Sequence, residues 1–212
     1  MACKKLRPLY LARLLHGRTD EEHTVTVKDM IAYLDRLGIH AERKAVYDDL
    51  ELLRLFGMDI VHTKTKTHNY HLGQRSFELP ELKLLIDVVQ ASPFLTAKKS
   101  MELIRKLEGL ASEAQAGDLR RQVYVLSRVK THNEQLYYNI DGIHQAINQN
   151  RLVQFRYFDL SIRAERLYRR GGQVYRECPA ALCVDRHYYL VAYRPQQQKF
   201  VHFRVDRISD LQ

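Results

Sequence analysis

Long apolar runs are missing from this sequence of 212 residues. The longest stretch without Asp, Glu, Lys or Arg covers only ten residues, 88–97, whereas a membrane-spanning helix needs about 20 apolar residues. The first residues include Lys4, Lys5 and Arg7 and show neither the apolar segment nor the cleavage site of a signal peptide. We therefore expect no membrane partner and no secretion signal.

Cysteine is also scarce, with only Cys3, Cys178 and Cys183 in the chain. Three unevenly spaced cysteines do not make a disulfide framework. The composition is 45% hydrophobic and 28% charged, which allows a buried core and excludes disorder of the whole chain. These features favour a soluble, reduced, cytoplasmic protein.

Patterns typical of enzymes and metal sites are absent as well. No Gly-rich phosphate loop follows a predicted strand, and no nucleophile, base or carboxylate pair stands in a known local signature. Two groups contain metal-ligating residue types, but their spacing matches no common zinc pattern. We therefore expect no enzyme, no cofactor and no metal site; the two groups are His62, His68 and His71, and Cys178, Cys183 and His187.

Acidic residues are fewer than basic ones: the chain has 25 Asp and Glu and 34 Lys and Arg, which gives a net charge of +9. Such an excess favours a polyanionic partner, although a basic protein can also lack one. The excess is divided unevenly: residues 1–75 carry +3, residues 76–149 are neutral and residues 150–212 carry +6. This division predicts two binding modules joined by a neutral connector, with these boundaries.

The first module is predicted to contain three helices and a hairpin. Apolar residues at helical spacing predict helices over about 5–16 and 27–37, and Thr26 with Asp29 forms a predicted capping box. Gly38 ends the second helix, and a third helix is predicted shortly after it. Its apolar stripe consists of Val46, Leu50 and Leu53, and Leu52 and Leu55 are expected to widen this stripe. This order predicts a helix-turn-helix, or else an ordinary three-helix core.

Two β-rich runs, 58–62 and 69–72, follow the third helix and flank a basic tip. A hairpin directly after the second helix of a helix-turn-helix is a wing, so the fold expected here is a winged helix. Arg and Lys can reach base edges or phosphates, and Tyr can bond phosphate. The candidate DNA-contacting residues are Arg43, Lys44 and Tyr47 on the helix and Lys64 and Lys66 on the hairpin.

The segment Ala45-Val46-Tyr47-Asp48-Asp49-Leu50-Glu51-Leu52-Leu53 resembles the recognition helix of DeoR-like winged-helix regulators, which commonly reads Thr-Val-Tyr-Arg-Asp-Ile-x-x-Leu. Ala45 replaces the Thr and Asp48 replaces the Arg. An Asp would repel phosphate, so no DNA contact is assigned to Asp48.

The neutral segment 76–149 is predicted to be helical, with apolar stripes over 79–89, 101–107 and 136–147 and a further element over 117–127. Thr96 is the expected cap of the second of these helices. A symmetric DNA site needs two copies of a wing, so these helices are candidates for the contact of a homodimer, or simply pack within the chain.

From residue 150 the pattern changes to short strands separated by turns, which predicts a small β-barrel or a strongly bent antiparallel sheet. The overall fold class expected is therefore α+β.

Three segments of this last module resemble a WYL domain: Cys178 to Leu182, His187 to Tyr193, and His202 to Ile208. Tyr188-Tyr189-Leu190 stands for the Trp-Tyr-Leu triplet of the family, in a chain without Trp. The resemblance implies an SH3/Sm-like barrel that follows a winged helix in bacterial transcriptional regulators. Members commonly extend beyond the barrel, whereas this sequence ends just after the last segment.

The resemblance also implies a pocket for a nucleotide or a piece of nucleic acid, at the positions Tyr189, His202, Arg204 and Arg207. These residue types suit an anion, because Arg offers a planar fork to phosphate and Tyr can stack. Without the resemblance, ion pairs of these arginines with Glu165, Glu177 or Asp206 would be the simpler interpretation.

Two functions are thus expected from the sequence. The first is a DNA-binding transcriptional regulator whose WYL-like domain senses a nucleotide or nucleic-acid effector and acts on double-stranded DNA. The second is a nucleic-acid-binding protein that holds RNA or single-stranded DNA through the barrel without regulation; a structural adaptor would do neither.

Overall fold

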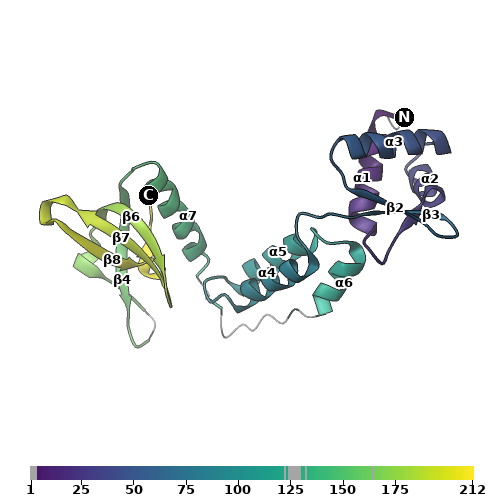
Figure 1. Ribbon diagram of the computed structural model, residues 1–212. Helices are drawn as coiled ribbons and strands as arrows, with labels where there is room; N and C mark the ends of the chain where they lie inside the picture. Colours follow the sequence, from purple (N-terminus) through teal and green to yellow (C-terminus); the bar gives the residue numbers. More distant parts are fainter. Residues whose placement is uncertain (1–3, 122, 124–129, 132, 164) are drawn as a thin grey trace. The chain divides into compact units, whose positions relative to one another are not determined.

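The computed structural model describes residues 4–121, 123, 130–131, 133–163 and 165–212 (Figure 1). Contacts divide the chain into two units, residues 1–90 with 101–124 and residues 91–100 with 125–212. The segment predicted as a connector, 76–149, is therefore shared between the two units. Among the described residues no helix combines the length and the apolar character that crossing a membrane requires.

The first unit begins with three helices and a small antiparallel sheet. Its strands lie in the order β1-β3-β2, and β3 pairs with both others. The short strand β1 was not predicted from the sequence. The elements are a 3-10 turn (Lys4–Leu6), α1 (Arg7–Arg18), β1 (Val25–Thr26), α2 (Val27–Arg36), α3 (Arg43–Leu55), β2 (Ile60–Lys64) and β3 (His68–Leu72).

The core of this part lies between the three helices and the sheet. α2 and α3 are separated by only six residues, and Gly38 at their junction has φ +73°, a conformation that favours glycine. The buried apolar side chains of this core come from the three helices, from β2 and β3 and from the turn between α2 and α3; they are Leu11, Leu14, Leu15, Val27, Met30, Leu34, Ile39, Val46, Leu50, Leu53, Ile60 and Tyr70.

The predicted wide apolar stripe of α3 is wrong at two positions. Val46, Leu50 and Leu53 are buried, but Leu52 and Leu55 are 53% and 86% exposed. The buried three lie at i, i+4 and i+7, on the side that faces α1 and α2, whereas Leu52 and Leu55 point away from it. The buried apolar stripe of α3 is narrow; Asp49 is also buried and Ala45 and Arg54 are half-buried, and the other side chains of the helix are exposed.

The capping box predicted at the start of α2 is confirmed. The Asp29 backbone N–H donates to Thr26 Oγ1 at 3.3 Å, and the Thr26 N–H donates to Asp29 Oδ2 at 2.9 Å. These reciprocal bonds satisfy backbone groups that the helix itself leaves free, and they fix where α2 begins.

Replacing Thr26 with Ala is expected to lower the free energy of unfolding by about 1 kcal/mol, because the cap is lost and nothing replaces it. Thr24→Ala, at an exposed loop position two residues earlier, is the matched control and is expected to change it by less than about 0.5 kcal/mol. Denaturant titration measures both; equal losses in the two variants would contradict the capping role.

Three further helices follow: α4 (Leu79–Ala91), α5 (Ala97–Glu108) and α6 (Glu113–Arg121). Thr96 caps α5 as predicted, since its Oγ1 accepts from the Lys99 N–H at 3.1 Å. Ser112 does the same for α6 by accepting from the Gln115 N–H at 3.1 Å. The element predicted over 117–127 overlaps the end of α6, and residues 122 and 124–127 lie outside the described residues.

The second unit contains helix α7 and an antiparallel sheet that curls into a half-barrel (Figure 1). Its strands lie in the order β5-β4-β6-β7-β8, and β9 also pairs with β4. Leu136 and Ile143 of α7 pack into the same core as Phe155 and Leu190 of the sheet. The elements are α7 (Gln135–Asn148), β4 (Val153–Leu160), β5 (Arg166–Tyr168), β6 (Tyr175–Val184), β7 (Tyr188–Arg194), β8 (Lys199–Arg204) and β9 (Ile208–Ser209).

Candidate nucleic-acid interface and effector site

Three of the candidate DNA-contacting residues lie on the exposed part of α3. Arg43 and Lys44 are its first two residues, and Tyr47 lies one turn further and is 42% exposed. Asp48, at the position where the DeoR-like pattern has Arg, is exposed beside them. The start of α3 therefore presents two cations and a phenol to solvent, with one carboxylate next to them.

An ion pair between α1 and α3 holds this end of the helix. Arg7 donates through Nε and Nη2 to the carboxylate of Asp49, with Nη2 to Oδ1 at 3.0 Å, and Nη2 also donates to the Ala45 carbonyl at 3.3 Å. Asp49 is only 6% exposed, and the hydrogen bonds from Arg7 to its carboxylate raise the pKa of Arg7 above its ordinary value. The pair fixes α3 against α1 just where Arg43, Lys44 and Tyr47 begin the helix.

The hairpin places Lys64 at the end of β2 and Lys66 in the turn, both exposed. The turn has a defined shape, because the Thr65 N–H donates to the Thr67 carbonyl at 3.0 Å and Asn69 Nδ2 donates to Thr65 Oγ1 at 3.0 Å. Both lysines are therefore presented on an ordered tip.

Two of the three hairpin histidines come together. His62 Nε2 and His68 Nδ1 are 2.8 Å apart, and the His62 ring also stacks on Tyr70 with centroids 4.8 Å apart. His71 neighbours Tyr70 on β3 and therefore points to the other face of the sheet. Within the described part of the chain, no three His, Cys, Asp or Glu residues are grouped to hold a metal ion.

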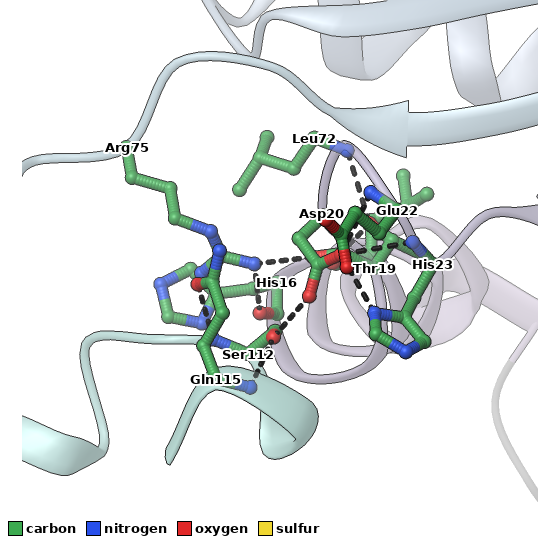
Figure 2. Close-up of polar contacts among 10 residues, drawn as sticks. His16, Thr19, Asp20, Glu22, His23, Leu72, Arg75, Ser112 and Gln115 are labelled. Atoms are coloured by element: carbon green, nitrogen blue, oxygen red, sulfur yellow. Dashed lines mark hydrogen bonds and ion pairs between the residues drawn. The ribbon is translucent and has the colours of Figure 1, made fainter. Parts of the chain in front are cut away.

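A buried polar network that was not predicted from the sequence joins the loop after α1 to the end of β3 and to the start of α6 (Figure 2). It consists of Thr19, Asp20, Arg75 and Ser112, and we call it the Asp20 network. Thr19 Oγ1 donates to the Leu15 carbonyl at 2.6 Å and accepts from the Leu72 N–H at 3.0 Å. The chain is thus held where it leaves the hairpin.

Asp20 is the centre of this network and is 4% exposed. Its carboxylate accepts from the Ser112 hydroxyl, from the backbone N–H groups of Glu22 and His23 at 3.0 and 2.8 Å, and lies 2.8 Å from His23 Nδ1. Burial alone would raise the pKa of Asp20, but these hydrogen bonds outweigh it, and the pKa is lowered.

Arg75 completes the network from the segment after β3 (Figure 2). Its Nη2 donates to the carbonyls of Thr19 and His16 at 2.5 and 2.8 Å, and its Nη1 donates to the Leu110 carbonyl at 3.3 Å. These carbonyls belong to the end of α1 and to the α5–α6 connection. Hydrogen bonds of the Asp20 network therefore hold the hairpin, the end of α1 and the start of α6 together.

A groove of about 760 Å³ lies beside this network. Six carboxylate residues line it, against only one Arg and one His, so its charge is unsuited to a phosphate-bearing ligand. The six are Asp20, Glu21, Glu22, Glu78, Glu81 and Asp118.

In the second unit, Tyr189, His202 and Arg204 share the outer face of neighbouring strands. Tyr189 pairs directly with Arg204, and Val191 pairs with His202, so all three point away from the buried Leu190 and Phe203. Tyr193 and Phe200 extend the same face, with ring centroids 5.1 Å apart. We call this surface the β7–β8 face; it combines aromatic rings with a guanidinium and an imidazole.

Arg204 on this face is ion-paired. Its Nε and Nη2 donate to the two oxygens of Asp206 at 3.1 and 2.7 Å, and Nη2 lies 3.2 Å from His187 Nδ1. The bond to Asp206 raises the pKa of Arg204. Arg204 therefore forms the ion pair with Asp206 that was the simpler interpretation of the sequence. Its side chain remains 27% exposed on the sheet face.

Arg207 is bonded elsewhere. It follows β8 in a 3-10 turn (Val205–Arg207), and its Nη1 donates to Asp159 Oδ1 of β4 at 2.7 Å. Its position thus differs from that of the other three predicted effector residues. The two-residue spacing predicted a shared face for His202 and Arg204, but it gave no direction for a residue beyond the end of the strand.

The comparison with family models decides the nature of this second fold. The model described as WYL domain matches residues 138–212, which include most of α7 and every strand from β4 to β9. This segment is a WYL domain.

Among solved structures, the chain is similar to Proteasome accessory factor B/C (PafBC) of Arthrobacter aurescens, with 21% identity and a TM-score of 0.29. The match covers 97% of this chain but 32% of that one, so the chain spans about a third of the length of its solved relative. A comparison with curated proteins gives no match.

Proposed function

We propose that the protein is a DNA-binding transcriptional regulator whose WYL domain binds a nucleotide or a short single-stranded nucleic acid. The observation that carries the proposal is the WYL domain at 138–212 in one chain with α1, α2, α3 and the β2–β3 hairpin. Three helices followed by a hairpin is the order expected of a winged helix, and the WYL resemblance implies that such a module precedes the domain in regulators; this order supports the proposal.

The charges of the first unit support a duplex-binding role. Cations stand at the start of α3 and at the hairpin tip, and the Arg7–Asp49 pair and the Asp20 network fix the elements that carry them. An exposed helix start can enter the major groove, while a basic hairpin tip meets phosphate or the minor groove. Selection of bound duplexes from a random pool, with and without nucleotides, tests this function: recovery of no enriched sequence would contradict it.

The β7–β8 face supports the effector role, and it also supports the alternative of a single-strand binder without regulation. Exposed aromatic residues on neighbouring strands stack with bases, and Arg or His beside them can bond phosphate. The two functions differ in coupling, because only a regulator changes its duplex affinity when the effector binds.

Replacing Tyr189, His202 and Arg204 together with alanine is expected to weaken binding of a short oligothymidylate by about tenfold or more, since each stacked base contributes about 1–3 kcal/mol. The matched control replaces Tyr138, His144 and Arg176, the same residue types exposed on α7 and β6, and should retain binding. Fluorescence anisotropy measures both variants, and an equal loss in the control would assign binding to general charge rather than to the β7–β8 face.

A further inference from the structure

Two arginines of the WYL domain share a single carboxylate. Arg169 donates to Asp159 through Nε at 2.6 Å and through Nη2 at 3.1 Å, and Arg207 Nη1 donates to the same carboxylate at 2.7 Å. The side chains of Asp159, Arg169 and Arg207 are 36%, 52% and 27% exposed, so solvent reaches all three. We call these residues the Asp159 cluster.

Backbone pairing fixes the positions of this cluster. Asp159 on β4 pairs with Leu167 of β5, two residues before Arg169, and Tyr157 pairs with Ile208 of β9, directly after Arg207. The Arg169 guanidinium also lies over the Tyr157 ring, 5.3 Å from its centroid. Strand pairing thus holds β4 beside the segments that carry Arg169 and Arg207, and the two guanidinium groups are oriented before any ligand binds.

The cluster carries an excess of positive charge, unlike its neighbours. Arg204 is paired with Asp206 and Arg194 with Glu177, one cation to one anion. At Asp159 two cations face one anion, and their proximity lowers the pKa of Asp159, through the bond from Arg169 first. Close by in sequence, Arg166 lies over the Phe158 ring and Arg170 over the Tyr175 ring, at 4.8 and 4.5 Å.

One donor of the cluster is also unused. Arg207 Nε is buried and has no hydrogen-bond partner among the residues that the structure describes. A carboxylate has only two oxygens, and here both are already engaged by three N–H groups. A phosphate group offers more acceptor oxygens and a charge of about −1.5 to −2 at neutral pH, so it satisfies two guanidinium groups better than Asp159 does.

We propose that Arg169 and Arg207 form a phosphate-binding site in which Asp159 is an internal anion that an incoming phosphate group displaces. The site lies apart from the β7–β8 face, and it deepens the proposed function and rests on its effector role, because Arg207 is also one of the positions that the WYL resemblance assigns to an effector. Pyrophosphate binding itself requires neither duplex DNA nor the β7–β8 face. The ligand class is a phosphate or diphosphate group, whether free, at the end of a nucleotide or within a nucleic-acid backbone.

Calorimetric titration of the full chain with pyrophosphate tests the proposal. Asp159→Asn keeps the shape of the side chain and removes the competing charge, so it is expected to raise pyrophosphate affinity about tenfold. Arg207→Lys keeps the positive charge but removes the planar guanidinium that can donate two hydrogen bonds to one phosphate. It is expected to lower the pyrophosphate affinity about tenfold. Asp206→Asn is the matched control, because it removes an equal charge beside Arg204. It should change the pyrophosphate affinity by less than about twofold.

Unchanged affinity in Asp159→Asn, or an equal gain in Asp206→Asn, would overturn the proposal, since the effect would then be one of net charge. Far-UV circular dichroism and melting curves establish that each variant is folded. If Arg207→Lys does not fold, Arg169→Lys provides the same test at the more exposed arginine of the cluster, and it is likewise expected to lower the pyrophosphate affinity.

Competition experiments identify the source of the phosphate. Hexathymidylate with and without a 5′-phosphate is titrated against bound pyrophosphate; displacement by the phosphorylated form alone assigns the site to terminal phosphate, and displacement by both assigns it to the backbone. If pyrophosphate binds as expected and neither oligonucleotide displaces it, the phosphate site stands and the proposed single-strand effector is wrong for this site.

Discussion

Replacement of Asp20 by alanine is expected to lower the free energy of unfolding of the first unit by about 2–4 kcal/mol. The carboxylate is buried and accepts hydrogen bonds from Ser112 and from two backbone N–H groups. Alanine leaves these donors without an acceptor, and an unpaired buried donor costs more than the net contribution of one hydrogen bond. Denaturant titration followed by circular dichroism measures the loss.

Two controls separate the network from general effects of the loop. Glu22→Ala removes an exposed carboxylate two residues away and should change stability by less than about 0.5 kcal/mol. Ser112→Ala removes one donor to Asp20 together with the cap of α6, and is expected to cost about 1–2 kcal/mol. A loss in Asp20→Ala no larger than that in Glu22→Ala would contradict the central position of Asp20.

The pH dependence of stability provides an independent check on Asp20. Its pKa is lower in the folded protein than in the unfolded chain, so the stability it contributes is present above the unfolded value of about 3.9 and is lost as the pH falls through the folded value. Asp20→Asn should therefore flatten the loss of stability that occurs as the pH falls below about 4. An unchanged slope would contradict the lowered pKa.

The second large effect concerns binding of double-stranded DNA. A variant with Arg43, Lys44, Lys64 and Lys66 changed to alanine and Tyr47 to phenylalanine is expected to lose about 100-fold or more in affinity at about 0.1 M salt. The salt dependence should also become shallower by about 0.9 for each phosphate contact removed. Fluorescence anisotropy with a selected duplex measures the affinity at several salt concentrations.

The matched control removes the same number of cations from exposed positions of α4 and α5, namely Lys83, Lys98, Arg105 and Lys106. If only net charge mattered, this control would lose as much affinity as the α3 and hairpin variant. That result would contradict the assignment of DNA contacts to α3 and to the hairpin, although it would leave the WYL domain unaffected.

Local features of the fold could be predicted from the sequence. The Thr26–Asp29 capping box, the Thr96 cap and the hairpin around Lys66 depend on residues within a few positions of one another. The two-residue spacing of His202 and Arg204 likewise gives a shared strand face. Helical periodicity was less reliable at Leu52 and Leu55, because the width of a buried stripe depends on which neighbours cover the helix.

The contacts that fix the candidate sites join residues too far apart for sequence patterns. Arg7 and Asp49 are 42 positions apart, Asp20 and Ser112 are 92, and Asp159 and Arg207 are 48. Each is a charged or polar residue whose partner depends on tertiary packing, and a single sequence gives no signal for the pairing. For this reason no direction could be predicted for Arg207, which the resemblance groups with Tyr189, His202 and Arg204 but which is bonded to Asp159.

The most direct test of regulation is to titrate a selected duplex with the full chain in the presence and absence of a saturating short single-stranded oligonucleotide. We expect the oligonucleotide to change duplex affinity about fivefold or more, and the duplex to change oligonucleotide affinity by the same factor, because coupling between two sites is reciprocal. The variant lacking Tyr189, His202 and Arg204 should bind the duplex normally without this change. Equal duplex affinity with and without every oligonucleotide and nucleotide tested, in a protein that binds both ligands, would contradict regulation by an effector.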